Sequence, residues 1–113
     1  MKEKFNVLLL PQAVEFIDNL DDKTREKIFF TIKKAQHYDD HELFKKLNDN
    51  IWEFRTLYNK KAYRLFAFWN KDITEETIVI GTHCILKKTD KTPVKEIEKA
   101  EEMRKKYLNY KTK

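Results

Sequence analysis

The fold is decided by residues 51–69, which read IWEFRTLYNKKAYRLFAFW. Ile51–Tyr58 and Ala62–Trp69 are rich in aromatic residues and include β-branched ones, a composition that favours strands. Asn59-Lys60-Lys61 lies between them and suits a tight turn. Since short turns join antiparallel neighbours, this stretch predicts a β-hairpin.

The hairpin is predicted to extend into a larger sheet. Asn70–Glu76 forms a short connection after it, and Thr77–Leu86 again has the composition of a strand. Near the N-terminus, Phe5–Leu10 is a short apolar strand stopped by Pro11. We therefore expect an antiparallel meander of three strands and one earlier strand.

Helices are predicted on both sides of the meander. Two apolar stripes at helical spacing precede it, separated by Asp21-Asp22, of which the second can cap a new helix. The stripes are Ala13, Phe16, Ile17 and Leu20, and then Ile28, Phe29, Ile32 and Ala35. Thr92 at an N-cap and Pro93 at the first helical position predict a last helix. The expected fold is α+β, in the order β-α-α-β-β-β-α, with an N-terminal helical hairpin and a C-terminal helix.

Length and composition bound the class of protein. The 113 residues suit one domain, residues 1–113, and one glycine and two prolines exclude a Gly-rich phosphate loop. Lys and Arg total 24 against 19 Asp and Glu, an excess of +5 that favours an anionic partner. The single cysteine, Cys84, indicates a reducing compartment. No apolar run approaches the roughly 18 residues of a membrane span, so we expect a cytoplasmic protein without a membrane partner.

Two arginines lie in the middle of the hairpin strands. By alternation Arg55 shares a face with Glu53, and Arg64 shares a face with Ala62 and Phe66. Such an arginine is often solvated or ion-paired, and Glu53 is an available partner. The spacing leaves that structural role and a phosphate-binding role equally open.

The connection before the last helix is basic. Lys87, Lys88 and Lys91 lie there with two threonines, just ahead of a helix N-terminus whose N–H groups attract anions. This arrangement suits phosphate, although an isolated lysine loop is more often simply solvated.

Histidine and cysteine offer weaker candidates for chemistry. His83 is a possible general acid or base, but strand histidines are more often packed and hydrogen-bonded. His37 and His41 lack the further ligands of a metal site, and Cys84 lacks a clear histidine partner. We expect neither metal nor cofactor. Aromatic side chains on an open face of the sheet would be able to stack on unpaired RNA bases.

Several motifs together resemble the phage-derived Gp49-like branch of the RelE/HigB toxins. The resemblance runs from about Leu47 to Tyr107 and rests on four segments: WEFR at 52–55, YRLF at 63–66, HCILKKTDKTP at 83–93 and EIEKA at 96–100. It implies a RelE-like fold and the toxin of a type II toxin–antitoxin pair. Such toxins cleave mRNA in the ribosomal A site without metal, and the 2′-hydroxyl attacks the adjacent phosphorus.

The resemblance also implies roles for individual residues. Arg55 and Arg64 match the strand arginines that would brace the scissile phosphate. Lys87 and Lys88 match the basic loop, and His83 matches the motif histidine, so these are catalytic candidates. Lys46, Thr89 and Lys91 are expected to contact RNA. The implied partners are mRNA on the ribosome and a helix-turn-helix antitoxin that forms a hetero-oligomer with the toxin.

Two other functions remain open at this point. ParE-type toxins resemble the same fold but poison DNA gyrase and cleave nothing. A degenerate module would only bind its antitoxin, which the presence of Arg55, Arg64 and the lysine loop argues against.

Overall fold

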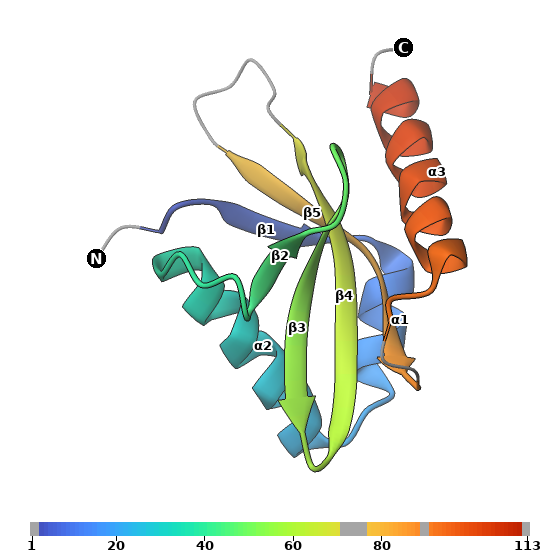
Figure 1. Ribbon diagram of the computed structural model, residues 1–113. Helices are drawn as coiled ribbons and strands as arrows, with labels where there is room; N and C mark the ends of the chain where they lie inside the picture. Colours follow the sequence, from blue (N-terminus) through green and yellow to red (C-terminus); the bar gives the residue numbers. More distant parts are fainter. Residues whose placement is uncertain (1–2, 71–76, 89–90, 112–113) are drawn as a thin grey trace.

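The predicted hairpin forms the centre of a five-stranded sheet in the computed structural model, which describes residues 3–70, 77–88 and 91–111 (Figure 1). Two strands of the hairpin pair antiparallel, with Arg55 opposite Arg64. Asn59 and Lys60 form the turn between them with φ of 53° and 63°. Positive φ at both central residues is the backbone of a type I′ hairpin turn, which suits the twist of paired strands.

The elements of the chain in order are β1 (Asn6–Leu9), α1 (Pro11–Asp18), α2 (Asp22–His37), β2 (Phe44–Lys46), β3 (Trp52–Tyr58), β4 (Lys61–Asn70), β5 (Ile78–Lys87) and α3 (Val94–Lys111). The mixed α+β class, the helical hairpin and the C-terminal helix are as predicted. Within the described residues, none of the helices is long and apolar enough to cross a membrane.

The predicted strand count and strand order are wrong. An additional strand, β2, pairs with β3 at the sheet edge, and the sheet order is β1-β5-β4-β3-β2. Moreover, β1 is parallel to β5, so only the other four strands form an antiparallel meander. β2 has three residues, of which two are lysines, and such a segment is too short for alternation to reveal. Five other elements separate β1 from β5 along the chain. No local sequence pattern indicates that these two strands pair.

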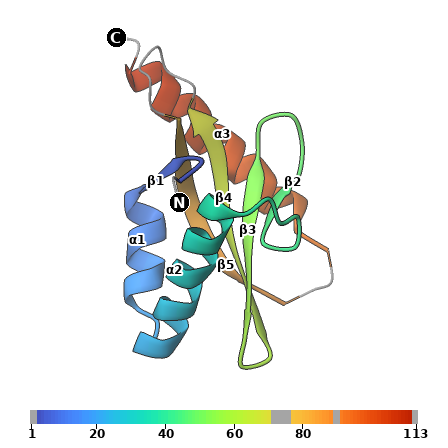
Figure 2. The same ribbon diagram turned by 90° about the vertical axis from the view of Figure 1, so that its left-hand side faces the viewer.

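The helices cover both faces of the sheet. Figure 2 shows α1 and α2 side by side, and they bury one apolar cluster that includes Ile17, Ile28 and Phe54. A second cluster, which includes Phe66, Phe68 and Ala100, lies between the sheet and α3. Burial of these two clusters is the main source of stability, because each removes apolar surface from water.

The helix starts differ slightly from expectation. Asp21, not Asp22, caps α2, and its carboxylate accepts a hydrogen bond from the Thr24 amide. The first bonds of α3 end on the carbonyl of Pro93, one residue later than predicted. Thr92 therefore lies outside the helix, and its hydroxyl donates a hydrogen bond to Glu53.

An aromatic cluster fastens β2 to the sheet. The Phe44 ring stacks on Phe54 with centroids 4.3 Å apart and on Trp52 at 4.8 Å, while Phe5 lies 5.4 Å from Phe44. These rings join the start of β1, the extra strand and the hairpin. The one apolar residue of β2 therefore explains why so short a strand is ordered.

We predict that Phe54→Ala lowers the free energy of unfolding by about 3–5 kcal/mol, because it leaves a cavity in this cluster. Leu57→Ala on the same strand is the matched control, since that side chain is 72% exposed, and it should change stability by less than about 0.5 kcal/mol. Denaturant unfolding measures both. Equal losses in the two variants would contradict this description of the core.

Candidate functional site

The register of β3 and β4 brings two arginines and one carboxylate together. Arg55 and Arg64 are cross-strand partners, and Glu53 lies two residues from Arg55 on the same face. The Glu53 carboxylate lies 3.8 Å from Arg55 Nε and 3.6 Å from Arg64 Nε. Glu53 is only 3% exposed and Arg64 6%. The ion pair with Glu53, one of the two roles that the spacing left open for the strand arginines, therefore exists for both Arg55 and Arg64.

These ion pairs leave hydrogen-bonding capacity unused. The Nε–H groups of Arg55 and Arg64 are both buried and have no hydrogen-bond partner in the part of the chain that the structure describes, since their distances to Glu53 exceed hydrogen-bond length. Arg64 does donate through Nη1 to the Tyr63 carbonyl. Burial lowers the pKa of the Arg64 guanidinium, the Glu53 carboxylate opposes this shift, and the Arg55 charge adds to it. Two cations facing one anion leave an excess positive charge that a further anion would stabilise.

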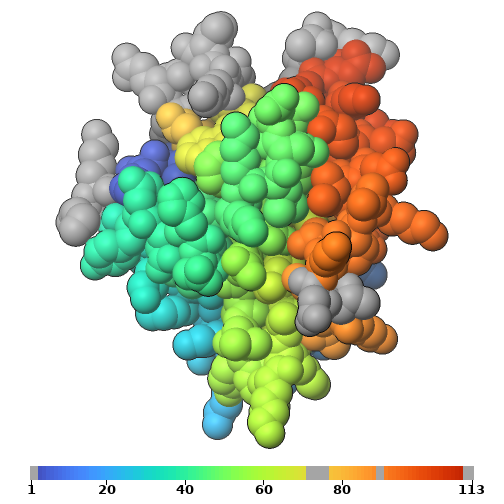
Figure 3. Space-filling model, in the orientation of Figure 1, coloured from blue at the N-terminus to red at the C-terminus, as the bar shows by residue number. Residues whose placement is uncertain are grey.

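A basic groove opens at the arginines. It has a volume of about 390 Å³ and lies between α2 and the part of β3 and β4 that runs beyond the end of β2. Figure 3 shows the segments coloured for α2 and β3 adjacent on this face of the molecule. Among the described residues that line it, four are cations, Lys27, Lys34, Arg55 and Arg64, and one is a carboxylate, Glu42.

The two lysines of α2 are functional candidates that the sequence analysis did not identify. On a helical wheel they belong to the polar face of α2, like any solvated lysine. They become part of a site only because α2 packs across the sheet beside β3. A heptad spacing from Lys27 to Lys34, which puts both on one side of the helix, was the available signal.

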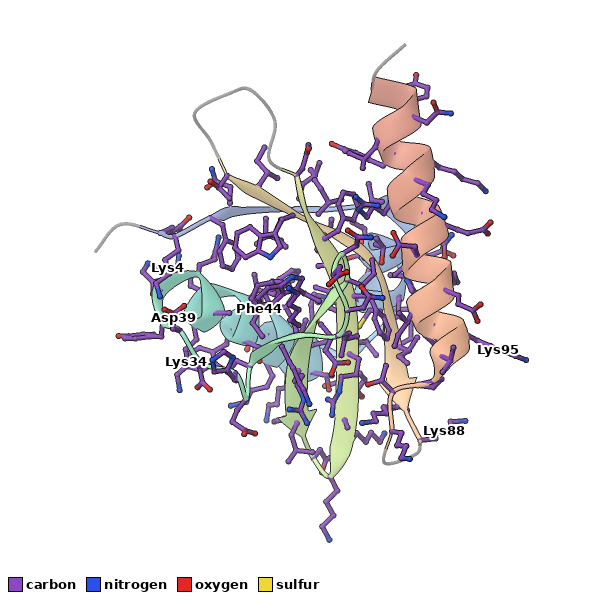
Figure 4. All side chains as sticks on the ribbon, turned by 45° about the horizontal axis from the view of Figure 1, so that its top comes forward. Lys4, Lys34, Asp39, Phe44, Lys88 and Lys95 are labelled. Atoms are coloured by element: carbon purple, nitrogen blue, oxygen red, sulfur yellow. The ribbon has the colours of Figure 1, made fainter. Side chains whose placement is uncertain are left out.

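The chain that leads into α3 touches the same cluster from its other side. The Thr92 hydroxyl donates a hydrogen bond of 3.1 Å to Glu53 Oε1. Lys87, half-buried at the end of β5, is the cross-strand partner of Ala62, two residues from Arg64. Lys88 and Lys91 are exposed, and Thr89 lies outside the described residues. Figure 4 shows Lys34 and Lys88 on opposite sides of the strands.

His83 lies on the α3 side of the sheet, at a β-bulge. The register shifts between Leu65 and Ala67, so that two residues of β5 oppose Phe66. The imidazole is 3% exposed and stacks on the Phe66 ring with centroids 4.8 Å apart.

Polar contacts hold the His83 ring at both nitrogens. In the neutral tautomer with its proton on Nε2, Nε2–H donates to Glu96 Oε1 at 2.9 Å. Nδ1 then lies 3.1 Å from the Thr82 hydroxyl, which also has the Phe66 carbonyl as an acceptor at 3.3 Å. His83 thus joins β5 to α3 and is not part of the groove lining. Its acid–base role stays a prediction.

Two other candidates lie away from the arginines. Lys46 is exposed on β2 and lines a separate hollow with Trp52, Trp69 and Arg104. Cys84 is buried, and burial raises the pKa of its thiol to about 12. The thiol therefore carries no nucleophilic thiolate near neutral pH. Among the described residues, no three His, Cys, Asp or Glu side chains are grouped to hold a metal ion.

We predict that Glu53→Gln lowers the free energy of unfolding by about 3 kcal/mol, because it leaves two neighbouring cations without their buried counter-charge. Inorganic phosphate should restore more stability to this variant than it adds to the wild type. Glu98→Gln, an exposed position on α3, is the control. Thermal unfolding with and without phosphate checks this, and an unchanged melting temperature in Glu53→Gln would contradict it.

The pH dependence of stability tests the His83 contacts. Burial lowers the pKa of His83 below its ordinary value of 6.5, partly opposed by the hydrogen bond to Glu96. The unfolded chain therefore takes up this proton first as the pH falls, and stability is lost below pH 6.5. We predict that His83→Gln removes part of the loss measured by urea unfolding between about pH 7.5 and about 5.5. His41→Gln, at an exposed position, should keep all of it, and an undiminished loss in His83→Gln would refute this assignment.

The comparison with known families matches the part of the chain that contains the residues of this site. The family model described as phage-derived protein Gp49-like (DUF891) matches residues 15–105. This range contains the hairpin, both strand arginines, Glu53 and the chain leading into α3. Among curated proteins, none matches the chain. Because the model spans most of the sequence, the chain belongs to the phage-derived Gp49-like family, which is associated with toxin-like phage proteins.

Proposed function

We propose that this protein is a RelE/HigB-type toxin that cleaves mRNA on the ribosome in the bacterial cytosol. The observation that carries the proposal is the pair of guanidinium groups of Arg55 and Arg64, which belong to residues that line a basic groove and whose Nε–H donors have no hydrogen-bond partner among the described residues. A phosphodiester supplies both the negative charge and the acceptor oxygens that these donors lack.

The reaction is an internal transesterification of RNA. The 2′-oxygen attacks the adjacent phosphorus and forms an O2′–P bond, while the P–O5′ bond breaks. The 2′-hydroxyl proton leaves to a base, and the 5′-oxygen takes up a proton, which gives a cyclic phosphate and a 5′-hydroxyl end. Charge accumulates on the phosphorane oxygens, and preorganised cations there stabilise the transition state more than the substrate.

The chain's own residues take defined parts in this step. Arg55 and Arg64 bind the scissile phosphate, and Glu53 fixes the two guanidinium groups in place. Lys27 and Lys34 bind neighbouring phosphates on one side. Lys87, Lys88 and Lys91 do so on the other side or donate the proton to the leaving oxygen.

A partner follows from the same proposal. A Gp49-like toxin is expected to be paired with an antitoxin, here a helix-turn-helix protein encoded beside it. Such a protein would neutralise the toxin by covering the basic groove or by blocking access to the ribosome.

We predict that Arg64→Lys reduces cleavage by about 100-fold, because lysine keeps the charge but loses the planar pair of donors. The wild type should arrest growth and produce discrete, translation-dependent cuts, mapped by primer extension on abundant mRNAs. Lys60→Ala, in the exposed turn of the same hairpin, is the matched control and should behave as the wild type.

Other outcomes would overturn the proposal in distinct ways. Growth arrest with intact mRNA would favour a binding toxin of the gyrase-poison type. A folded wild-type protein that neither arrests growth nor cuts mRNA would be an interaction module.

A further inference from the structure

A large aromatic ring is exposed on the wall of the groove. Phe30 on α2 is 58% exposed, whereas the rings of Phe5, Phe44 and Phe54 are buried in the core. Phe30 lines the groove together with Arg55 and Arg64. The cleavage chemistry proposed above gives this ring no part, and burial does not explain it.

Cations accompany the ring on the same helix. The Lys27 ammonium lies over the Phe30 ring, 5.2 Å from its centroid. Lys34 lies two helical turns from Lys27, about 10 Å along the axis. Neither lysine has an ion pair within the described parts of the chain. No carboxylate among these residues therefore compensates either charge.

Phe30 also separates the groove from a second hollow. This neighbouring hollow has a volume of about 440 Å³ and is lined by Phe30, Lys33, Lys34, His37 and Tyr38. Phe30 and Lys34 belong to both hollows. The ring is thus a ridge between two basic depressions of the size range of small-ligand sites.

We propose that Phe30 is a stacking platform for one unpaired base of single-stranded RNA, and that Lys27 and Lys34 bind the phosphates on either side of that nucleotide. The RNA then runs along α2 and delivers the next phosphate to Arg55 and Arg64. The identity of the ligand rests on the proposed function, whereas the stacking site rests on the geometry of α2.

The arrangement favours a nucleotide over an acidic peptide. A polynucleotide carries one negative charge and one flat base in every nucleotide. The α2 wall of the groove has a matching arrangement, with a lysine before and after the Phe30 ring. The groove leads to two guanidinium groups whose paired donors match phosphate oxygens. An acidic protein segment is the competing occupant and is an outcome of the test.

The probe is a labelled oligomer of about six 2′-O-methyl adenosines, a length within the range of single-strand binding sites. Its blocked 2′-oxygen prevents cleavage, so fluorescence anisotropy reports binding alone. Phe30→Ala should raise the Kd about 5- to 150-fold, the range found for loss of one base stack. Phe30→Trp should restore binding. Phe29→Ala is the matched control, since Phe29 is the adjacent residue of α2, 43% exposed, and does not line the groove.

An oligomer in which every base is absent isolates the stacking contribution. The wild type and Phe30→Ala should bind this abasic oligomer equally, because only the phosphate contacts remain. Equal effects of Phe30→Ala and Phe29→Ala on the adenosine oligomer would overturn the platform. Binding of a glutamate-rich peptide without binding of either oligomer would overturn it too, and would assign the groove to a protein partner.

These outcomes are separate from those for cleavage. If Phe30 fails as a platform while the wild type still cuts mRNA, the proposed function stands and the subsite falls. If the oligomer binds through Phe30 but no mRNA is cut, the subsite stands and the chain is an RNA-binding protein without nuclease activity.

Discussion

The buried carboxylate of Glu53 is the interaction on which the site depends. It lies within ion-pair distance of Arg55 and Arg64 and accepts a hydrogen bond from Thr92. One side chain therefore joins β3, β4 and the chain leading into α3. Without it, two guanidinium groups would face each other in a poorly solvated environment, where like charges are costly. Because Glu53 compensates only one of two charges, it holds the arginines in place and still leaves them attractive to an anion.

The layout of the fold explains why this cluster opens on one side. β2 pairs only with residues 52–54 of β3, so the C-terminal part of β3 forms a sheet edge beside α2. The groove lies at this edge, with α2 as its outer wall. α3 and the His83–Glu96 contact cover the face of the sheet that carries Phe66. A strand of RNA that reaches Arg55 would therefore approach across α2 or across the lysines that follow β5.

The local parts of this arrangement were predictable from sequence, and the parts set by packing were not. The turn at Asn59-Lys60 fixes the register of the hairpin and so places the arginines opposite each other. Lys27 and Lys34 line the groove because α2 packs beside β3, and His83 contacts Glu96 on α3. No periodic pattern in the sequence predicts either contact. β2 was not predicted because a strand of three residues is too short to show an alternation of apolar and polar side chains. The Thr92 hydroxyl was predicted to start a helix, yet it binds Glu53.

The most direct test of the central claim is an NMR titration that follows the ¹⁵Nε–¹H resonances of the arginines as a 2′-O-methyl RNA oligomer is added. If Arg55 and Arg64 bind phosphate through their unpartnered Nε–H groups, these two resonances should shift downfield and exchange more slowly with water. Arg25 and Arg104, which form ion pairs elsewhere, should not change. Bound RNA that shifts Arg25 or Arg104 and leaves Arg55 and Arg64 unaffected would contradict the account.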